Sequence, residues 1–224
     1  MDKKKIAGDK AAEFVKDGMI IGLGTGSTAY HVVNAIGERV KNGLKIKAVP
    51  TSKATEEQAK SLGIPLLTID EVEYIDIDID GVDEIDPAFN AVKGGGGALY
   101  REKVVADISK EVIWIMDDSK LVDAIGAFPL AVEIAQYGYK QTMQKMENFG
   151  LKPVLRIRDG KPYITDNGNF IADLQLSAGF DIADTAEKLD NMVGVLEHGL
   201  FLNTCKKIVV GTENGAVITE NKGK

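Results

Sequence analysis

The sequence has 224 residues, of which 44% are hydrophobic and 27% are charged, and its formal net charge is −7 at pH 7. These proportions are typical of a globular protein with its own core, and the length suits one large domain or a main domain with a smaller one attached. The acidic balance argues against non-specific binding to nucleic acids or anionic membranes. A small anionic ligand stays possible, because a local group of N–H donors and lysines outweighs the global charge at short range.

The rarest residue types restrict the chemistry further. The single cysteine, Cys205, excludes an intrachain disulfide and fits a reducing compartment. No apolar run approaches the ~20 residues that a membrane span requires, and no signal-peptide-like stretch follows the expected N-terminal helix. We therefore expect a cytoplasmic protein without a membrane partner. With only His31 and His198 present, we expect no histidine-rich metal site and a carboxylate as any general base.

Strand and helix patterns alternate through the first half of the sequence. Short apolar runs predict strands at residues 19–23, 46–50, 64–67, 74–79 and 112–116. Apolar residues at helical spacing predict helices at 27–41 and 54–62. This alternation predicts an α/β domain with a doubly wound, mainly parallel sheet.

The pattern changes after about residue 128. We expect strands at 131–135, 153–158, 163–165 and 170–176, and helices at 140–149 and 184–192. This order predicts a smaller α+β insert domain of the ferredoxin-like type, with Phe170 and Phe201 in its core rather than at a subunit contact. Strands at 207–211 and 216–218 then return to the first domain. The expected domains are therefore a Rossmann-like domain of residues 1–128 and 205–224, and an insert of residues 129–204.

A glycine- and hydroxyl-rich turn, Gly24-Thr25-Gly26-Ser27-Thr28, follows the first predicted strand and leads into a helix. Such a turn brings backbone N–H groups and the positive end of a helix to one place, which suits a phosphate group. Gly24, Gly26 and Ala29 also match the spacing of a dinucleotide fingerprint, but the second strand ends in 50–52 without a carboxylate for the ribose. The other alternative is a tight turn that only packs the helix on the strand.

The run Asp76-Ile77-Asp78-Ile79-Asp80 alternates charged and apolar residues, the pattern of a strand with one apolar face. A calcium loop beginning at Asp76 would need a glutamate at its twelfth position, where Pro87 stands. We interpret Asp76 and Asp78 as solvated or paired strand residues. Asp80 and Asp83 fall at the carboxyl end of the strand, where open α/β sheets bind ligands. A turn or cap formed by Asp83 and Glu84, or a magnesium site, are the weaker alternatives.

The most informative segment is Lys93-Gly94-Gly95-Gly96-Gly97. Glycine loses more conformational entropy on ordering than any other residue, so four in succession indicate a loop whose N–H groups approach an anion. Lys93 adds a point charge that can stabilise an oxyanion developing during a reaction. Glu102 follows about one turn into the next predicted helix, where a desolvated carboxylate can act as a base.

Two alternatives stay open for the charged residues around this segment. Arg101, Glu102 and Lys103 could form a solvated helix face without a chemical role. Lys120, which follows the strand that ends near Asp117, is either a second phosphate contact or a surface lysine.

Taken together, these segments resemble the A type of ribose-5-phosphate isomerase, nearly from end to end. The resemblance is carried by Gly-Thr-Gly-Ser-Thr at 24–28, Asp-Gly-x-Asp-Glu at 80–84, Lys-Gly-Gly-Gly at 93–96, Arg-Glu-Lys at 101–103, Asp-x-Ser-Lys at 117–120 and Thr-Asp-Asn-Gly-Asn at 165–169. Motifs that occur together in the same order are far more specific than any one of them.

The resemblance implies interconversion of D-ribose 5-phosphate and D-ribulose 5-phosphate through an ene-diolate, a step of the non-oxidative pentose phosphate pathway, without a metal or organic cofactor and commonly in a homodimer. It implies that Glu102 is the base, that Lys93 and the following N–H groups stabilise the oxyanion, and that Asp80 and Asp83 hold sugar hydroxyls and assist ring opening. The substrate-binding residues that it implies are Thr25, Gly26, Ser27, Thr28, Asp80, Gly81, Val82, Asp83, Lys93, Gly94, Gly95, Gly96 and Lys120.

Two other functional classes are weighed against this one. A sugar-phosphate sensor in a regulator would carry a basic helix-turn-helix segment, for which the sequence before residue 19 is too short. An amino-sugar deaminase or a lactonase on a similar sheet would be expected to place a histidine in the reacting centre. Neither His31 nor His198 lies in a polar motif, so the isomerase hypothesis is favoured.

Overall fold

The computed structural model describes residues 2–223, and the chain divides into two compact units. It passes from the first unit to the second after Val82, returns at Arg101, leaves again after Lys120 and returns finally at Asn203. The segment 83–100, which the sequence analysis places in the first domain, thus groups with the second unit. The reason is strand pairing: β5 (Ala91–Val92) pairs with both β4 (Glu84–Ile85) and β13 (Leu200–Phe201) in a small antiparallel sheet.

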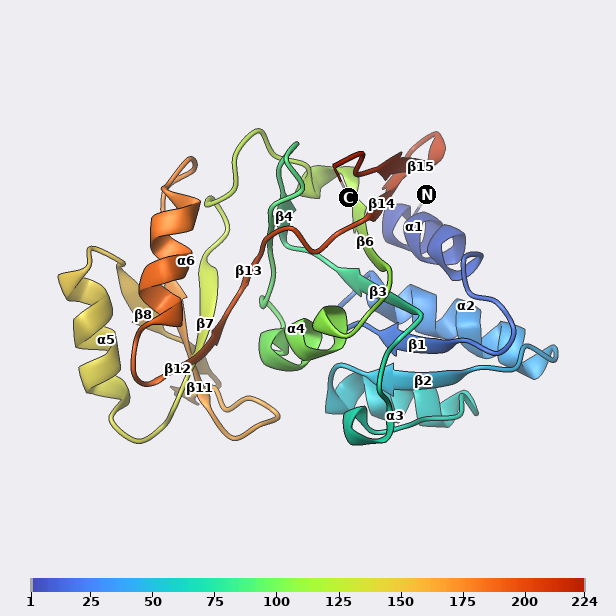
Figure 1. Ribbon diagram of the computed structural model, residues 1–224, viewed down its shortest axis with the longest axis horizontal. Helices are drawn as coiled ribbons and strands as arrows, with labels where there is room; N and C mark the ends of the chain where they lie inside the picture. The colour runs from blue at the N-terminus through green and yellow to red at the C-terminus, as the bar shows by residue number, and fades with distance from the viewer. Residues whose placement is uncertain (1, 224) are drawn as a thin grey trace. The chain divides into compact units, whose positions relative to one another are not determined.

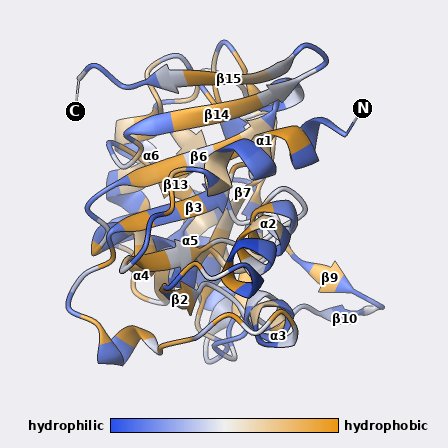
Figure 2. Ribbon diagram, turned by 90° about the vertical axis from the view of Figure 1, so that its right-hand side faces the viewer, coloured by the Kyte–Doolittle hydropathy of each residue, from blue (hydrophilic) through white to orange (hydrophobic). Residues whose placement is uncertain are grey.

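The first unit contains a six-stranded sheet in the order β15-β14-β6-β3-β1-β2, and Figure 2 shows its strands side by side. Neighbouring strands are parallel except for β15, which runs antiparallel at one edge. The chain therefore leaves β1 towards one edge of the sheet and β3 towards the other. The carboxyl ends of these two strands form the topological switch point at which doubly wound sheets bind ligands. The strands are β1 (Ile20–Leu23), β2 (Lys47–Pro50), β3 (Ile77–Gly81), β6 (Val112–Asp117), β14 (Lys207–Thr212) and β15 (Gly215–Glu220).

Helices cover both faces of this sheet. On one face, α1 (Lys3–Ala12) and α2 (Ala29–Lys41) contribute Ala7, Val32 and Ile36 to a core that includes Ile79 of β3. On the other face, Val105 of α4 (Leu99–Asp107) packs with Val49 and Ile75. The remaining helix, α3 (Lys53–Ser61), follows β2. The predicted doubly wound α/β architecture is confirmed.

Two predicted strands differ from the structure. The segment 64–67 makes only a single bridge, between Ala48 and Leu66, because Pro65 has no N–H with which to continue a ladder. The segment predicted at 74–79 becomes a strand only at Ile77 and continues to Gly81. The later end matters for function because it places Asp80 within the strand.

The alternating run on β3 does not have one apolar and one solvated face. Ile77 and Ile79 belong to the core, but Asp78 and Asp80 on the other face are also fully buried. Asp76 is ion-paired with Lys110 at 2.9 Å, as expected for a paired residue, whereas the solvated alternative is wrong for Asp78. A central strand of a doubly wound sheet is covered on both sides, so its polar face is enclosed as well.

The second unit contains an antiparallel sheet in the order β12-β7-β11-β8, with α5 and α6 packed on one face (Figure 1). The order along the chain is β7 (Leu130–Ile134), α5 (Tyr139–Asn148), β8 (Pro153–Leu155), β11 (Phe170–Leu174), α6 (Ile182–Asp190) and β12 (Val195–His198). This is the βαββαβ arrangement, so the predicted ferredoxin-like insert is confirmed. Phe201 is buried, and Phe170 packs against the core between sheet and helices, as expected for core residues.

The segment between β8 and β11 forms a separate two-stranded hairpin. The strands β9 (Ile157–Arg158) and β10 (Lys161–Pro162) form a hairpin around Asp159 and Gly160, which have φ angles of 52° and 74°. Positive φ at both central residues is the signature of a type I′ turn. The strand expected at 163–165 is absent from the described chain, and Tyr163 packs instead with Leu99, Ala131 and Ile171. No helix within residues 2–223 is long and apolar enough to cross a bilayer.

Candidate functional site

The loop from β1 to α2, residues 24–28, is the candidate anion site and is called the anion loop below. Gly26 has a φ of 113°, and a Cβ at this position would meet no atom within 4 Å, so the loop is open there. Thr28 occupies the N-cap position of α2, yet its side chain makes no capping hydrogen bond to any described residue. The Tyr30 N–H donates to the Gly26 carbonyl at 2.9 Å and the His31 N–H to the Thr28 carbonyl at 3.1 Å, so the N–H groups that an anion could use are those that precede Tyr30.

Threonine hydroxyl groups that follow β2 and lie on α3 form hydrogen bonds with this loop and the end of β1. The Oγ1 atom of Thr25 lies 2.7 Å from that of Thr51 and 3.3 Å from that of Thr55. The Thr55 hydroxyl donates to the Gly24 carbonyl at 2.9 Å, and the Thr51 hydroxyl donates to that of Leu23 at 3.1 Å. Sequence reasoning used residues 50–52 only to exclude a ribose carboxylate and missed this support. The loop's shape is therefore set by the ends of β2 and α3.

Glycines on β1 and after it make room for carboxylates rather than for a ligand. A Cβ on Gly22 would overlap the Asp78 carboxylate, and a Cβ on Gly24 would overlap that of Asp80. The Asp80 Oδ1 atom accepts hydrogen bonds from the N–H groups of Thr25 at 2.9 Å and of Gly81 at 2.7 Å. The buried Asp80 thus links the anion loop to the carboxyl end of β3 through a hydrogen bond from Thr25.

One lysine contacts this loop, and a second acts on a carboxylate that the first also influences. Lys4, at the start of α1, donates from Nζ to the Ser27 hydroxyl at 2.9 Å. Partial burial raises the pKa of Asp117, but hydrogen bonds from Ser119 and the charges of Lys120 and Lys4 outweigh it and hold that pKa below its usual value. Both ammonium groups therefore act on the same carboxylate, that of Asp117. Lys120 was predicted; Lys4 was missed, although the run of lysines at 3–5 was a signal.

Glu102 lies on α4 and is only 4% exposed. The alternative of a solvated helix face is therefore wrong for this residue. A carboxylate that is removed from water can act as a proton acceptor.

The glycine loop belongs to the second unit and is tightly shaped. Gly94 and Gly97 have φ angles of 103° and 81°, and the Gly97 N–H donates to the Gly94 carbonyl at 2.9 Å to close a turn. Such angles are rarely available to residues with a Cβ. The Asp83 Oδ2 atom accepts from the Gly95 N–H at 2.8 Å. The predicted residues Asp83 and Gly95 are thus in direct contact.

Lys93, which begins this loop, is only 2% exposed despite its charge. Its N–H donates to the Gly199 carbonyl at 2.9 Å, and its Nζ atom lies 5.3 Å from the centre of the Phe201 ring. A buried ammonium is held in place by its surroundings, unlike a surface lysine. The packing therefore fixes the position of this charge, which the sequence alone does not specify.

Glu84 has a structural role next to these residues. Its carboxylate accepts hydrogen bonds from the N–H groups of Gly126 at 2.7 Å and Phe128 at 2.8 Å, and it is 6% exposed. It anchors a loop rather than forming the turn or cap considered for Asp83 and Glu84. The two neighbouring carboxylates of this motif thus accept hydrogen bonds from different segments, Asp83 from Gly95 and Glu84 from Gly126 and Phe128.

Comparisons with known proteins identify the family of the chain. The family model of ribose 5-phosphate isomerase A (phosphoriboisomerase A) matches residues 47–215. Ribose-5-phosphate isomerase A of Streptococcus suis is 56% identical over 220 residues, which are 98% of this chain and of that protein. The chain belongs to the ribose 5-phosphate isomerase A family. The resemblance seen in the sequence motifs is thereby confirmed.

Solved structures of this family share the fold. Ribose 5-phosphate isomerase from Plasmodium falciparum has a TM-score of 0.95 and 38% identity, with 98% of both chains covered. A D-ribose-5-phosphate isomerase in complex with phospho-erythronic acid has a TM-score of 0.94 and 36% identity, again over 98% of both chains. That relative binds a phosphorylated sugar acid.

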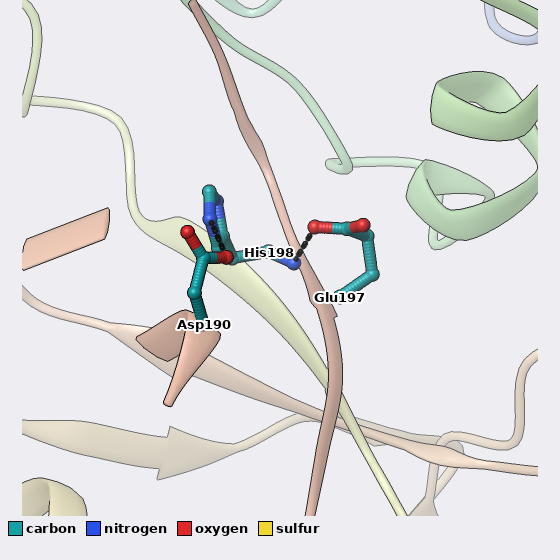
Figure 3. Close-up of side chains that lie close together, drawn as sticks. All are labelled: Asp190, Glu197 and His198. Carbon is teal, nitrogen blue, oxygen red and sulfur yellow. Dashed lines mark hydrogen bonds and ion pairs between the residues drawn. The ribbon is translucent and has the colours of Figure 1, made fainter. Parts of the chain in front are cut away.

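One further group of titratable side chains stands apart from the isomerase motifs. Asp190, Glu197 and His198 have ligand atoms within 4.8 Å of one another (Figure 3). The Leu200 N–H donates to His198 Nδ1 at 3.2 Å, so the proton of a neutral ring is on Nε2, which lies 3.1 Å from Asp190 Oδ1. The Glu197 carboxylate accepts from the His198 N–H at 2.8 Å. Hydrogen bonds within the second unit thus account for the cluster without a metal ion.

Proposed function

We propose that the protein is an aldose–ketose isomerase that interconverts D-ribose 5-phosphate and D-ribulose 5-phosphate in the pentose phosphate pathway. The observation that carries the proposal is the buried carboxylate of Glu102, which follows the Lys93 glycine loop by five residues in a chain of this family. The open anion loop at 24–28, with Lys4 beside it, supports a phosphate-bearing substrate.

The proposed reaction needs a base and a place for negative charge. Glu102 removes the proton from C2 of the open-chain aldose, and the C–H electron pair forms a C1–C2 double bond while the carbonyl electrons move to O1. Lys93 and the N–H groups of the glycine loop stabilise this oxyanion. O1 takes up a proton and the O2 hydroxyl loses one. Glu102 then returns its proton to C1, which leaves a carbonyl at C2.

The two aspartates are proposed to handle the sugar itself. Asp83 touches the glycine loop through Gly95, and Asp80 touches the anion loop through Thr25. We propose that they bind sugar hydroxyls and assist ring opening, because a carboxylate accepts hydrogen bonds from hydroxyls. Gly26, Thr28, Gly81, Val82, Gly94 and Gly96 complete the proposed binding set.

A coupled assay for ketopentose phosphate formed from ribose 5-phosphate tests the function. We expect turnover with ribose 5-phosphate, little with ribose, and competitive inhibition by phospho-erythronic acid. Dialysis against EDTA should leave the rate unchanged, since the proposed proton transfer uses only side chains. A folded protein that forms no ketopentose phosphate would contradict the proposal, and release of ammonia from an amino-sugar phosphate would favour a deaminase.

Lys4→Gln is expected to raise KM for ribose 5-phosphate roughly tenfold with a smaller effect on kcat. Lys4 contacts Ser27 in the anion loop, and an interaction with the non-reacting phosphate is present equally in substrate and transition state. Lys5→Gln is the matched control, because Lys5 is exposed and pairs with Asp9 on the same helix. Steady-state kinetics of the two variants decide the point; an unchanged KM in Lys4→Gln would remove Lys4 from the phosphate site.

We also propose that the active form is a cytoplasmic homodimer, as the resemblance implies. A single buried cysteine, Cys205, which forms no intrachain disulfide, fits a reducing compartment. The chain has a mass of 24.1 kDa, and sedimentation velocity at micromolar concentration is expected to give twice that mass. A single monomeric species that retains full activity would contradict the dimer.

A further inference from the structure

Two side chains of the ferredoxin-like part of the second unit donate hydrogen bonds to the backbone carbonyl groups of the glycine loop, residues 93–97. Arg156 donates from Nη1 to the carbonyl oxygens of Gly94 at 3.0 Å and Gly95 at 3.2 Å. The Tyr163 hydroxyl donates to the Gly96 carbonyl at 3.2 Å. Three successive carbonyl groups of the loop are thus fixed by two residues that no motif of the sequence singled out.

These contacts determine where the N–H groups of the loop point. A trans peptide is planar, so its N–H points away from its C=O. Because the Gly94 and Gly95 carbonyls both point at Arg156, the N–H groups of Gly95 and Gly96 point away from it. The Gly95 N–H indeed reaches Asp83 on that side. Successive N–H groups that point the same way form a nest that binds anions.

Arg156 is itself held rigidly. Its Nε donates to Asp173 Oδ2 at 2.8 Å and its Nη2 donates to the other oxygen of that carboxylate. The two side chains are only 13% and 19% exposed. A two-pronged pair fixes the plane of the guanidinium group, and a lysine ammonium cannot reproduce it.

The position of Tyr163 depends on Gly97, which its ring contacts, and on the turn at 165–169 that follows it. A Cβ on Gly97 would overlap the Tyr163 ring, so the last glycine of the loop is needed for the ring to approach. The Thr165 hydroxyl and the Asn169 amide, in the turn that follows, donate to Oε1 of the buried Glu133 at 2.7 and 3.0 Å. The motif at 165–169 thus anchors the segment that carries Tyr163.

We propose that Arg156 and Tyr163 are positioning residues that aim the glycine nest at the developing oxyanion. They hold the carbonyl groups so that the Gly96 N–H, next to the Gly95 N–H that already donates to Asp83, is oriented before negative charge appears. The cationic Arg156 also polarises two of the peptides and strengthens their N–H groups as donors. This inference rests on the proposed function, and it gives the ferredoxin-like part a role in the chemistry.

The test compares Tyr163→Phe and Arg156→Lys with Arg158→Lys. Arg158 is exposed and stacks on the Tyr163 ring with its Cζ 4.4 Å from the ring centre, so its replacement perturbs the same ring from the outside. We expect kcat to fall roughly tenfold in Tyr163→Phe and about a hundredfold in Arg156→Lys, with KM within about twofold. The N–H groups bind the oxyanion mainly in the transition state, so losing their orientation lowers kcat and leaves KM nearly unchanged. Arg158→Lys should match the parent protein.

A second measurement separates aiming from folding. If phospho-erythronic acid carries its carboxylate where the oxyanion develops, its affinity should fall by the same factor as kcat in each variant, with unfolding temperatures close to that of the parent. Unchanged kcat in folded variants, or a raised KM with unchanged kcat, would overturn the inference. Should Arg156→Lys fail to fold, Tyr163→Phe decides alone. A parent protein without isomerase activity would instead refute the proposed function.

Discussion

Glu102→Gln is expected to abolish measurable isomerisation while substrate still binds. The amide has nearly the same shape as the carboxylate and suits a position that is 4% exposed, but it cannot accept the C2 proton. General acid–base catalysis contributes about 10²–10⁴-fold to a rate, so kcat should fall by at least that range. The coupled assay gives kcat, and isothermal titration calorimetry gives the affinity for ribose 5-phosphate.

Asp107→Asn is the matched control for this substitution. Asp107 lies on the same helix, α4, but its side chain is exposed. Asp107→Asn should leave both kcat and substrate affinity unchanged. Comparing the two variants therefore distinguishes loss of the base from loss of any negative charge on the helix. Turnover at the parent rate in Glu102→Gln would remove Glu102 from the role of base.

The elements that position the candidate site follow from local sequence patterns. Apolar runs and helical spacing predict β1, α2, β2 and α3, since each pattern describes how a segment buries one face. The pattern at 74–79 misplaces β3 because an alternating run looks the same wherever its strand begins. It also hides the burial of Asp78, whose carboxylate lies against Gly22 of β1, where a Cβ would overlap it.

The supporting contacts of the site are less predictable than its motifs. Glycine runs and strand-end carboxylates stand out because few structural roles require them. Arg156 looks like any strand arginine, and its contact with Gly94 joins residues 62 positions apart. Thr55 is likewise an ordinary helix residue until the fold brings it under Gly24. Such partners are set by tertiary packing, which spacing along the chain does not encode.

Lys93→Ala should lower kcat about a hundredfold with little change in KM. An oxyanion donor is worth about 3 kcal/mol in the transition state, where its contact strengthens as charge develops. Lys93 is 2% exposed as a residue, so its charge acts where little water screens it. Steady-state kinetics at saturating and limiting ribose 5-phosphate give the two constants separately.

Removing a buried side chain also leaves a cavity, so Lys93→Met is measured beside the alanine variant. Methionine restores most of the lost volume next to Phe201 without the charge, and the two variants should lose similar activity if charge is what matters. Lys161→Ala, at an exposed residue of the β9–β10 hairpin, controls for the loss of a lysine elsewhere in the same unit. A variant with raised KM and parental kcat would instead make Lys93 a ground-state ligand of the phosphate. The oxyanion would then depend on the glycine nest alone, and the Tyr163 and Arg156 variants would have correspondingly larger effects.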